Sequence, residues 1–273
     1  MPDASILIRT LNEHEWVGRV IDACLAQTVP CEVIVIDSGS TDGTIRDVES
    51  RPSVRLLQIP QSEFTWGRSL NRGFAVATAP ILVALSAHAL PADRGWLARL
   101  LEPFADPAVA ATYGRHVPHP GLDPFRSAEV LNYWGGDARE DGPGDVRYSN
   151  VNGAIRAALW REHPFDESAP ASEDHIWATW AVGKGFRVVY VPEAAVYHSH
   201  AESIRARYRR LRSIAMADKT RRPAGEEWRR FVHLCGKDMR RIAKHPGKWR
   251  WAPYSPLVRA AEVLADRAAP RER

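Results

Sequence analysis

Short apolar runs alternate with polar, glycine-bearing segments along the first two-thirds of the chain. Residues 33–36 are four consecutive β-branched side chains, and residues 81–85 form another fully apolar run. Runs of this length are typical of strands that are buried on both faces of a parallel sheet. Between residues 15 and 27 the apolar side chains recur at helical spacing instead. The pattern therefore predicts a strand–helix–strand unit and an α/β fold.

The same pattern predicts the remaining elements. We expect strands at 5–8, 54–59, 109–114 and 187–191, ordered structure at 149–155, and helices at 44–50, within 64–78, and at 96–104, 156–162 and 175–184. Residues 118–145 are rich in Pro, Gly and Asp, which predicts a long loop, and such loops are usually functional or mobile. Basic helices should follow residue 200, and then a tail with Pro and Trp.

The charge of the chain and its cysteines indicate the kind of partner and the cellular compartment. The chain of 273 residues carries a net charge of +4, and the excess is concentrated between residues 205 and 250. Such a patch suits an anionic ligand, a polyanionic partner or a membrane surface. The three cysteines form neither a CxxC pair nor a metal-binding spacing, which favours a reducing cytoplasm. No segment resembles a membrane span or a signal peptide, so we expect a cytoplasmic protein, soluble or peripheral to the inner face of the membrane.

Polar clusters end three of the expected strands, at residues 9–13, 37–42 and 86–88. Strand ends on one edge of a parallel sheet converge, so these clusters should line a single crevice. The chain lacks both GxxxxGK[ST] and a GxGxxG after the first strand, which weakens the usual ATPase and dinucleotide interpretations. A nucleotide would then be held by side chains, such as Asp37 on base or ribose and Arg68 on phosphate.

Seven short polar motifs follow one another along the chain. They are Leu11-Asn12-Glu13, Asp37-Ser38-Gly39-Ser40-Thr41-Asp42-Gly43-Thr44, Arg68 to Asn71, Ser86-Ala87-His88, Asn152-Gly153, Glu173-Asp174 with Trp177, and His198. In this order the chain resembles the family 2 glycosyltransferases, which are inverting sugar-nucleotide enzymes. The resemblance covers roughly residues 4–200 and is greatest to bacterial rhamnosyltransferase-type members. It implies a GT-A fold, a Rossmann-like nucleotide-diphospho-sugar transferase with a mixed sheet, over residues 1–200. Residues 201–273 would then be a basic helical extension packed on that domain.

The resemblance also implies a reaction. An inverting transfer is one displacement at the anomeric carbon, in which a carboxylate takes the proton of the acceptor hydroxyl and a cationic group stabilises the departing diphosphate. Asp174 is the expected base, and Glu173 would orient it or hold the acceptor. The donor-binding residues implied are Arg9, Glu13, Asp37, Ser38, Arg68, Asn71, Ser86 and Ala87, and the acceptor-binding residues implied are Asn152, Gly153 and Trp177.

The expected donor is a deoxysugar on dTDP, followed by UDP and GDP sugars. The acceptor would be a glycan, a lipid-linked or a small molecule, and we expect no nucleic-acid partner.

Two positions depart from the family pattern. Ser38 replaces the second acid of the loop after the second strand, so Asp37 must recognise the nucleoside alone. Ser86-Ala87-His88 replaces the DxD motif, whose last acid binds a divalent metal in the family. His88 and His198 are the metal ligands implied here, and imidazole suits Mn²⁺ better than Mg²⁺. Three hypotheses stay open: a metal on these histidines, metal-free catalysis with basic groups on the diphosphate, or an inactive relative that only binds sugar nucleotides or glycans.

Overall fold

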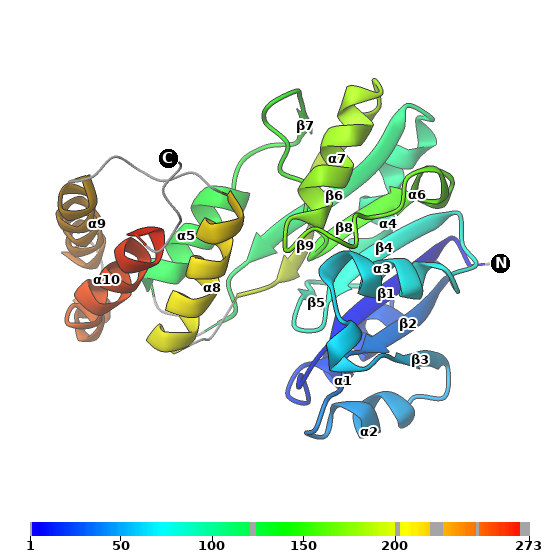
Figure 1. Ribbon diagram of the computed structural model, residues 1–273, viewed down its shortest axis with the longest axis horizontal. Helices are drawn as coiled ribbons and strands as arrows, with labels where there is room; N and C mark the ends of the chain where they lie inside the picture. Colours follow the sequence, from blue (N-terminus) through cyan, green and yellow to red (C-terminus); the bar gives the residue numbers. More distant parts are fainter. Residues whose placement is uncertain (1, 121–123, 200–202, 219–225, 244–245, 268–273) are drawn as a thin grey trace. The chain divides into compact units, whose positions relative to one another are not determined.

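A computed structural model describes residues 2–120, 124–199, 203–218, 226–243 and 246–267. The nine strands within these ranges form one mixed sheet in the order β3-β2-β1-β4-β8-β6-β9-β5, with β7 paired to β9 (Figure 1). They are β1 (Ala4–Thr10), β2 (Cys31–Asp37), β3 (Val54–Gln58), β4 (Ile81–Ser86), β5 (Leu90–Pro91), β6 (Val109–Val117), β7 (Arg139–Asp141), β8 (Asn152–Arg156) and β9 (Arg187–Tyr197). Strands β3, β2, β1 and β4 are parallel, whereas β8 runs antiparallel between β4 and β6. The predicted α/β class with a mixed sheet is confirmed.

Helices connect these strands. They are α1 (Val17–Leu25), α2 (Thr44–Glu49), α3 (Trp66–Phe74), α4 (Trp96–Leu101), α5 (Pro124–Trp134), α6 (Ala157–Glu162) and α7 (Glu173–Gly183), with short 3₁₀ turns η1 (Gln61–Glu63) and η2 (Glu102–Ala105). Ile8 of β1 packs in one hydrophobic cluster with Val20 of α1, whereas its neighbour Leu7 packs in a second cluster with Phe74 of α3. Because the side chains of a strand alternate between its faces, both faces of the sheet are covered. This two-sided burial explains the continuous apolar runs in the sequence.

The prediction of one long loop over residues 118–145 is wrong. Helix α5 and strand β7 lie within this stretch. Pro124 is the first residue of α5, where its missing N–H leaves no helical hydrogen bond unmade. Phe125, the next residue, is fully buried. The Pro, Gly and Asp residues that favoured a loop are concentrated on either side of the helix rather than inside it.

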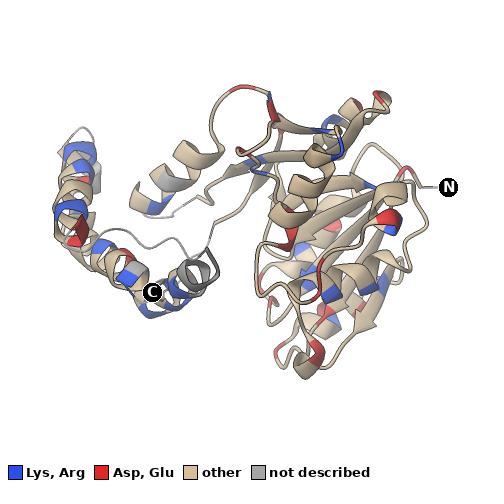
Figure 2. Ribbon diagram, turned by 45° about the horizontal axis from the view of Figure 1, so that its top comes forward, with Lys and Arg blue, Asp and Glu red and all other residues tan. Residues whose placement is uncertain are grey.

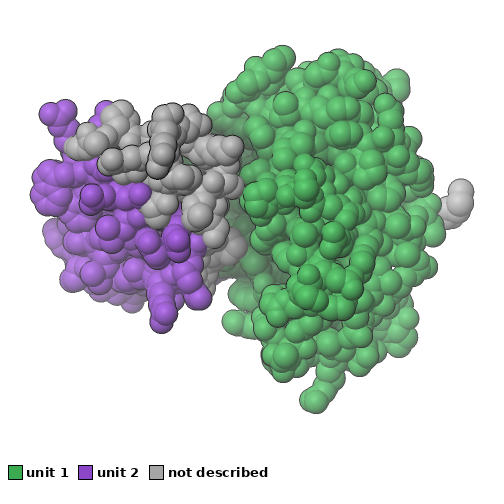
Figure 3. All heavy atoms as spheres, viewed as in Figure 1, with its two compact units in different colours: residues 1–119, 130–199 green, residues 120–129, 200–273 purple. Residues whose placement is uncertain are grey.

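The chain divides into two compact units, coloured in Figure 3. Unit 1 comprises residues 1–119 and 130–199, and unit 2 comprises residues 120–129 and 200–273. Unit 2 contains α8 (Ile204–Asp218), α9 (Glu226–Ala243), η3 (Pro246–Trp251) and α10 (Tyr254–Arg267). The expected C-terminal tail is therefore wrong for residues 254–267, which form a helix that packs against both α8 and α9. Packing of an extension on a domain ending at residue 200 stays a prediction.

Candidate active site

Hydrogen bonds to the Asp37 carboxylate hold the loop that follows β2. One carboxylate oxygen of Asp37 accepts the backbone N–H groups of Gly39, at 2.9 Å, and of Ser40, at 2.8 Å. The Ser40 hydroxyl donates to the other oxygen. Gly39 has a φ of 98°, in the left-handed region that glycine adopts without strain. Asp37 therefore shapes this loop, and its predicted contact with the nucleoside stays a prediction.

Asn12, which the sequence analysis assigned no role, ties the end of β1 to this loop. Its backbone N–H donates to the Ser40 hydroxyl at 2.8 Å, and its side-chain oxygen accepts the N–H of Thr41 at 2.8 Å. Asn12 has a φ of 55°, a conformation in which Asn is enriched. One residue further, the N–H of Glu13 donates to the hydroxyl of Thr44 at 2.8 Å. These contacts hold the two loops together.

The polar cluster after β4, residues 86–88, lies next to the loop that follows β1. The Glu13 carboxylate lies 2.9 Å from Nδ1 of His88. Ser86 donates its backbone N–H to the carbonyl of Val151 at 3.1 Å, and Ala87 is buried in the hydrophobic core. Ser38 is also buried, and its N–H donates to the carbonyl of Thr10 at 3.1 Å. The expected convergence of the three polar clusters is confirmed.

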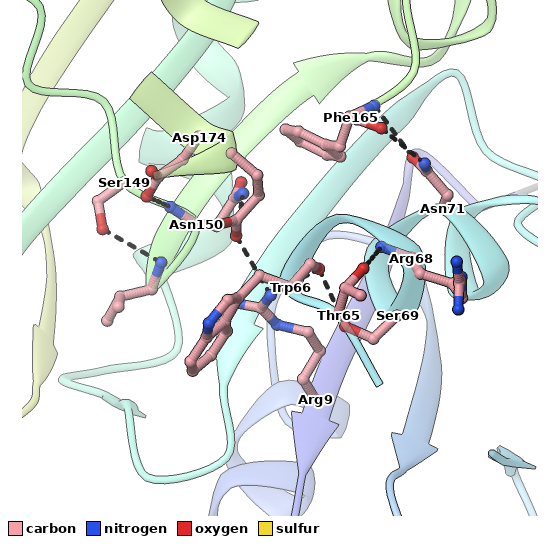
Figure 4. A network of polar contacts seen from close by, with 12 residues as sticks. Arg9, Thr65, Trp66, Arg68, Ser69, Asn71, Ser149, Asn150, Phe165 and Asp174 are labelled. Atoms are coloured by element: carbon pink, nitrogen blue, oxygen red, sulfur yellow. Dashed lines mark hydrogen bonds and ion pairs between the residues drawn. The ribbon is translucent and has the colours of Figure 1, made fainter. Parts of the chain in front are cut away.

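Two adjacent carboxylates begin α7 at this edge of the sheet. Glu173 is buried and accepts hydrogen bonds from Nη1 of Arg9, at 3.2 Å, and from the side-chain amide of Asn150, at 3.3 Å. Asp174 accepts the backbone N–H groups of Asn150, at 3.2 Å, and His175, at 2.8 Å. Figure 4 shows Arg9, Asn150 and Asp174 gathered around the start of the helix. Asn150 therefore contacts both acids, a role that the sequence alone did not indicate.

Asp174 has the electrostatic surroundings of a proton acceptor. Burial, and after it the negative charge of Glu173, raise the pKa of its carboxyl from the ordinary 3.8 to about 6. The two backbone N–H donors and the nearby Arg9 guanidinium act in the opposite direction on this pKa. A carboxylate with a pKa near 6 is mostly ionised at neutral pH and still basic enough to take a proton in a transition state.

Arg9 joins the carboxylates to the start of α3. It donates to the backbone carbonyl of Trp66 at 3.0 Å, and its guanidinium carbon lies 5.0 Å from the centroid of the Trp66 ring (Figure 4). The Trp66 side chain is 45% exposed beside the site. Sequence reasoning missed Trp66, although a large aromatic at the start of a predicted helix was a usable signal for sugar stacking.

Two predicted donor-binding residues on α3 are engaged elsewhere in the protein. Nε of Arg68 lies 2.8 Å from Glu167. The Asn71 side chain donates to the carbonyl of Phe165 and to Glu167, and it accepts from the N–H of Phe165 and the indole of Trp160. Asn71 thereby makes four hydrogen bonds, the capacity of its amide group. In this arrangement Asn71 anchors a loop, and donor contact by either residue stays a prediction.

The predicted acceptor-binding residues lie inside the protein. The buried Asn152 accepts from the indole of Trp96 at 2.9 Å and donates to the carbonyl of Ala194 at 2.9 Å. A Cβ on Gly153 would come within 2.5 Å of the Ser149 carbonyl oxygen, so this glycine permits close packing. Trp177 is 1% exposed and donates to the carbonyl of His163. This geometry gives all three residues structural contacts and adds no support for acceptor binding.

The two predicted metal ligands do lie together. The His88 and His198 rings stack with centroids 4.9 Å apart and planes 14° apart, and His116 approaches His198 edge-on at 5.0 Å. Imidazole lone pairs lie in the ring plane, so nearly parallel stacked rings direct them side by side rather than toward one ion. Within the described parts of the chain, no three His, Cys, Asp or Glu residues are grouped to hold a metal. As they stand, these side chains do not fit a shared divalent ion.

A model of the family described as "Glycosyl transferase family 2" matches residues 5–162, more than half of the chain. The chain belongs to this family. It is 30% identical over 217 residues to an O-antigen chain rhamnosyltransferase of Salmonella typhimurium, covering 76% of this chain and 69% of the relative. A second O-antigen chain rhamnosyltransferase, from Salmonella anatum, is 30% identical over 226 residues, covering 77% and 70%. The protein is therefore a glycosyltransferase, as predicted.

Solved structures confirm the GT-A fold. A mannosyltransferase from Pyrobaculum calidifontis, in complex with GDP-Man and Mn²⁺, aligns with a TM-score of 0.63 and 20% identity over 97% of this chain and 86% of that chain. Residues 1–349 of TarS from S. aureus, in complex with UDP-GlcNAc, align with a TM-score of 0.57 and 15% identity over 97% and 89%. At these identities the likeness concerns the fold alone.

Proposed function

We propose that the protein is an inverting glycosyltransferase in which Asp174 is the general base. The observation that carries this proposal is the partly buried Asp174 carboxyl, whose pKa of about 6 suits proton acceptance at neutral pH. Further support comes from its neighbour Glu173, which accepts a hydrogen bond from Arg9 at the end of β1, one of the polar strand ends expected to line the donor crevice.

The reaction requires one displacement. The acceptor hydroxyl donates a hydrogen bond to Asp174, and its oxygen attacks the anomeric carbon from the face opposite the nucleoside diphosphate. As the new glycosidic bond forms, the bond to the diphosphate breaks, and the nucleoside diphosphate leaves with the electron pair. Asp174 takes the hydroxyl proton. Arg9 and Asn150 hold Glu173 beside it, which fixes the start of α7 and keeps a negative charge near the base.

For the donor we propose a rhamnosyl group on a nucleoside diphosphate, dTDP first. The support is the two Salmonella relatives, which are named as rhamnosyltransferases, together with Ser38 in the nucleoside-side loop. The solved neighbours hold GDP-Man and UDP-GlcNAc, so these nucleotides are the natural comparisons in a binding screen. The name of the relatives also favours a growing glycan as the acceptor.

The Mn²⁺ in the Pyrobaculum calidifontis mannosyltransferase complex makes a metal requirement a proposal worth testing. The displacement proposed above uses no metal on these residues, because His88 and His198 are stacked rather than convergent. The test is a thermal-shift screen of dTDP, UDP and GDP with Mn²⁺, with Mg²⁺ and with chelator. Stabilisation follows RT ln(1 + [L]/Kd), so the preferred base gives the largest shift. If chelator changes no shift, His88 and His198 are not metal ligands.

The competing hypothesis is an inactive relative that only binds sugar nucleotides, favoured by the replacement of the DxD motif. An assay of nucleoside diphosphate release from a sugar donor separates the two hypotheses. The sugar can pass either to an acceptor or, by hydrolysis, to water. The enzyme should turn over as the wild type and lose turnover as Asp174→Asn. Wild-type protein that binds a donor tightly and never consumes it would establish the binding-only hypothesis.

A further inference from the structure

The basic residues of the chain are divided unevenly between its two parts. Residues 200–273 contain 20 Arg and Lys against 8 Asp and Glu, whereas residues 1–199 contain 17 against 25. Figure 2 shows Lys and Arg recurring along the helices of unit 2. The candidate active site, which lies in unit 1, uses none of this positive charge. Unit 2 therefore carries an excess of cations for which the proposed reaction gives no reason.

Helix α9 presents these cations on one side. Asp238 and Ile242 are its buried residues. On the opposite side Arg229, His233 and Arg240 are exposed, with a helical spacing of four and seven residues. Next to this basic stripe lies an apolar edge, on which Trp228 is 70% exposed and Val232 is 50% exposed. Lys237 is exposed on the other flank of the stripe.

Two of the three acids of α9, Glu227 and Asp238, are paired or turned away from this face, whereas Glu226 in the first turn is exposed. Asp238 is fully buried, and Nε of Arg259 on α10 lies 2.8 Å from its carboxylate. Glu227 faces Arg267 of α10 at 3.9 Å. Their negative charges are therefore used to join α9 to α10. The outward cations keep most of their field, and the face attracts anions.

The face stands on a rigid support. Arg259 bonds to both Asp238 and Glu262 at 2.8 Å, and Glu262 also pairs with Arg207 of α8. Ser255 donates to Asp238 at 2.7 Å. These buried charges satisfy one another, and removing one would leave its partner buried without a counter-charge. Substitutions on the exposed side of α9 leave this cluster untouched, so the face can be altered without unfolding unit 2.

We propose that the exposed side of α9, defined as Trp228, Arg229, Val232, His233, Lys237 and Arg240, docks on an anionic lipid bilayer. The helix would lie in the plane of the membrane surface, with Trp228 and Val232 among the headgroups and the cations against anionic lipid. Amphipathic helices with Trp on the apolar side and Arg and Lys on the polar side bind in this way. A nucleic acid would also attract the cations, but it offers nothing for the exposed Val232.

The test uses the full chain and sedimentation with lipid vesicles, either pure phosphatidylcholine or phosphatidylcholine mixed with phosphatidylglycerol. Wild-type protein should bind the anionic vesicles at low salt and dissociate from them at high salt. Each cation removed should weaken binding about fivefold, so R229Q/K237Q/R240Q should weaken it roughly a hundredfold. W228A, which removes apolar contact alone, should weaken it by about tenfold or more.

A matched control removes two Arg and one Lys from unit 1. Arg46, Arg161 and Lys184 are exposed, and R46Q/R161Q/K184Q changes the net charge by the same amount. This control should bind vesicles like the wild type. The proposal is overturned if wild-type protein binds both vesicle types equally, or if the α9 variant and the control weaken binding to the same extent. It is also overturned if wild type and W228A bind an RNA oligonucleotide equally while neither binds vesicles.

Discussion

Replacing Asp174 by Asn should stabilise the protein at pH 8 and abolish its activity. Burial and the charge of Glu173 hold the pKa of Asp174 at about 6, against 3.8 for the free side chain. The native state therefore keeps this proton to higher pH than the unfolded chain, and its stability falls as pH rises from below 4 through 6. Asn has a similar shape and no charge to bury, so it removes this unfavourable contribution.

The magnitude follows from the two pKa values. A difference of about two units corresponds to about 3 kcal/mol above pH 6. Asp174 accepts one backbone N–H on each carboxylate oxygen, and Asn retains only one of these acceptors. The lost hydrogen bond costs about 1 kcal/mol. D174N should therefore be more stable by about 2 kcal/mol at pH 8, and the gain should vanish near pH 4, where Asp174 is protonated.

Thermal unfolding at pH 8 and pH 5 measures this difference. For a chain of this size about 2 kcal/mol raises the melting temperature by roughly 4 °C or more. E49Q is a suitable control, because Glu49 is exposed on α2 and its replacement removes the same charge away from the site. If D174N leaves the melting temperature unchanged, or changes it equally at both pH values, the carboxyl of Asp174 does not have the raised pKa.

Three further predictions concern the pKa of Asp174, the Trp66 side chain and two glycines. In a pH–rate profile, the acidic limb should shift to lower pH in E173Q, because this variant removes a negative charge that raises the pKa of Asp174. The limb should shift to higher pH in R9Q, because this variant removes a positive charge that lowers the same pKa. Shifts of both variants in the same direction would contradict this account. W66A should raise the KM for the donor or acceptor sugar and leave the acidic limb in place, as expected of a stacking surface. G114A should lower the melting temperature and cost about 2 kcal/mol or more, since its Cβ would lie 1.9 Å from the Ala194 carbonyl oxygen, whereas G183A meets nothing within 4 Å and should be neutral or slightly stabilising.

The strands of the sheet were predictable because burial on both faces leaves a continuous apolar run, as in residues 33–36 and 81–85. Helix α5 was not, because its short apolar pattern is surrounded by Pro, Gly and Asp, whose average composition suggests a loop. Strand β9 extends to Tyr197, six residues beyond the predicted end, although Pro192 lies within it. Proline is compatible with a strand where its N–H is not needed for pairing, and the sequence does not reveal that.

The candidate site was predictable in outline and not in detail. Motif order led to Glu173 and Asp174, because this pair, followed by Trp177, matches a motif of the family that the chain resembles. The contact of Arg9 with Glu173 joins residues 164 positions apart, and nothing in either local sequence indicates it. The burial of Asn152 and Trp177 was equally hidden from the sequence, and their predicted contact with the acceptor stays a prediction. Their side chains point into the core, and this direction depends on the packing of β8 and α7 rather than on the motif.

The polar groups at the strand ends mostly bond to one another, and this has a consequence for substrate binding. Asp37, Ser40 and Asn12 fix the loops before any donor arrives. Ordering a residue costs about 1–2 kcal/mol, so loops that are ordered in advance do not subtract that cost from the binding free energy. A substitution such as Asn12→Ala should then weaken donor binding even if Asn12 never touches the donor. Affinity at this edge would depend on the shape of the loops as much as on any single contact.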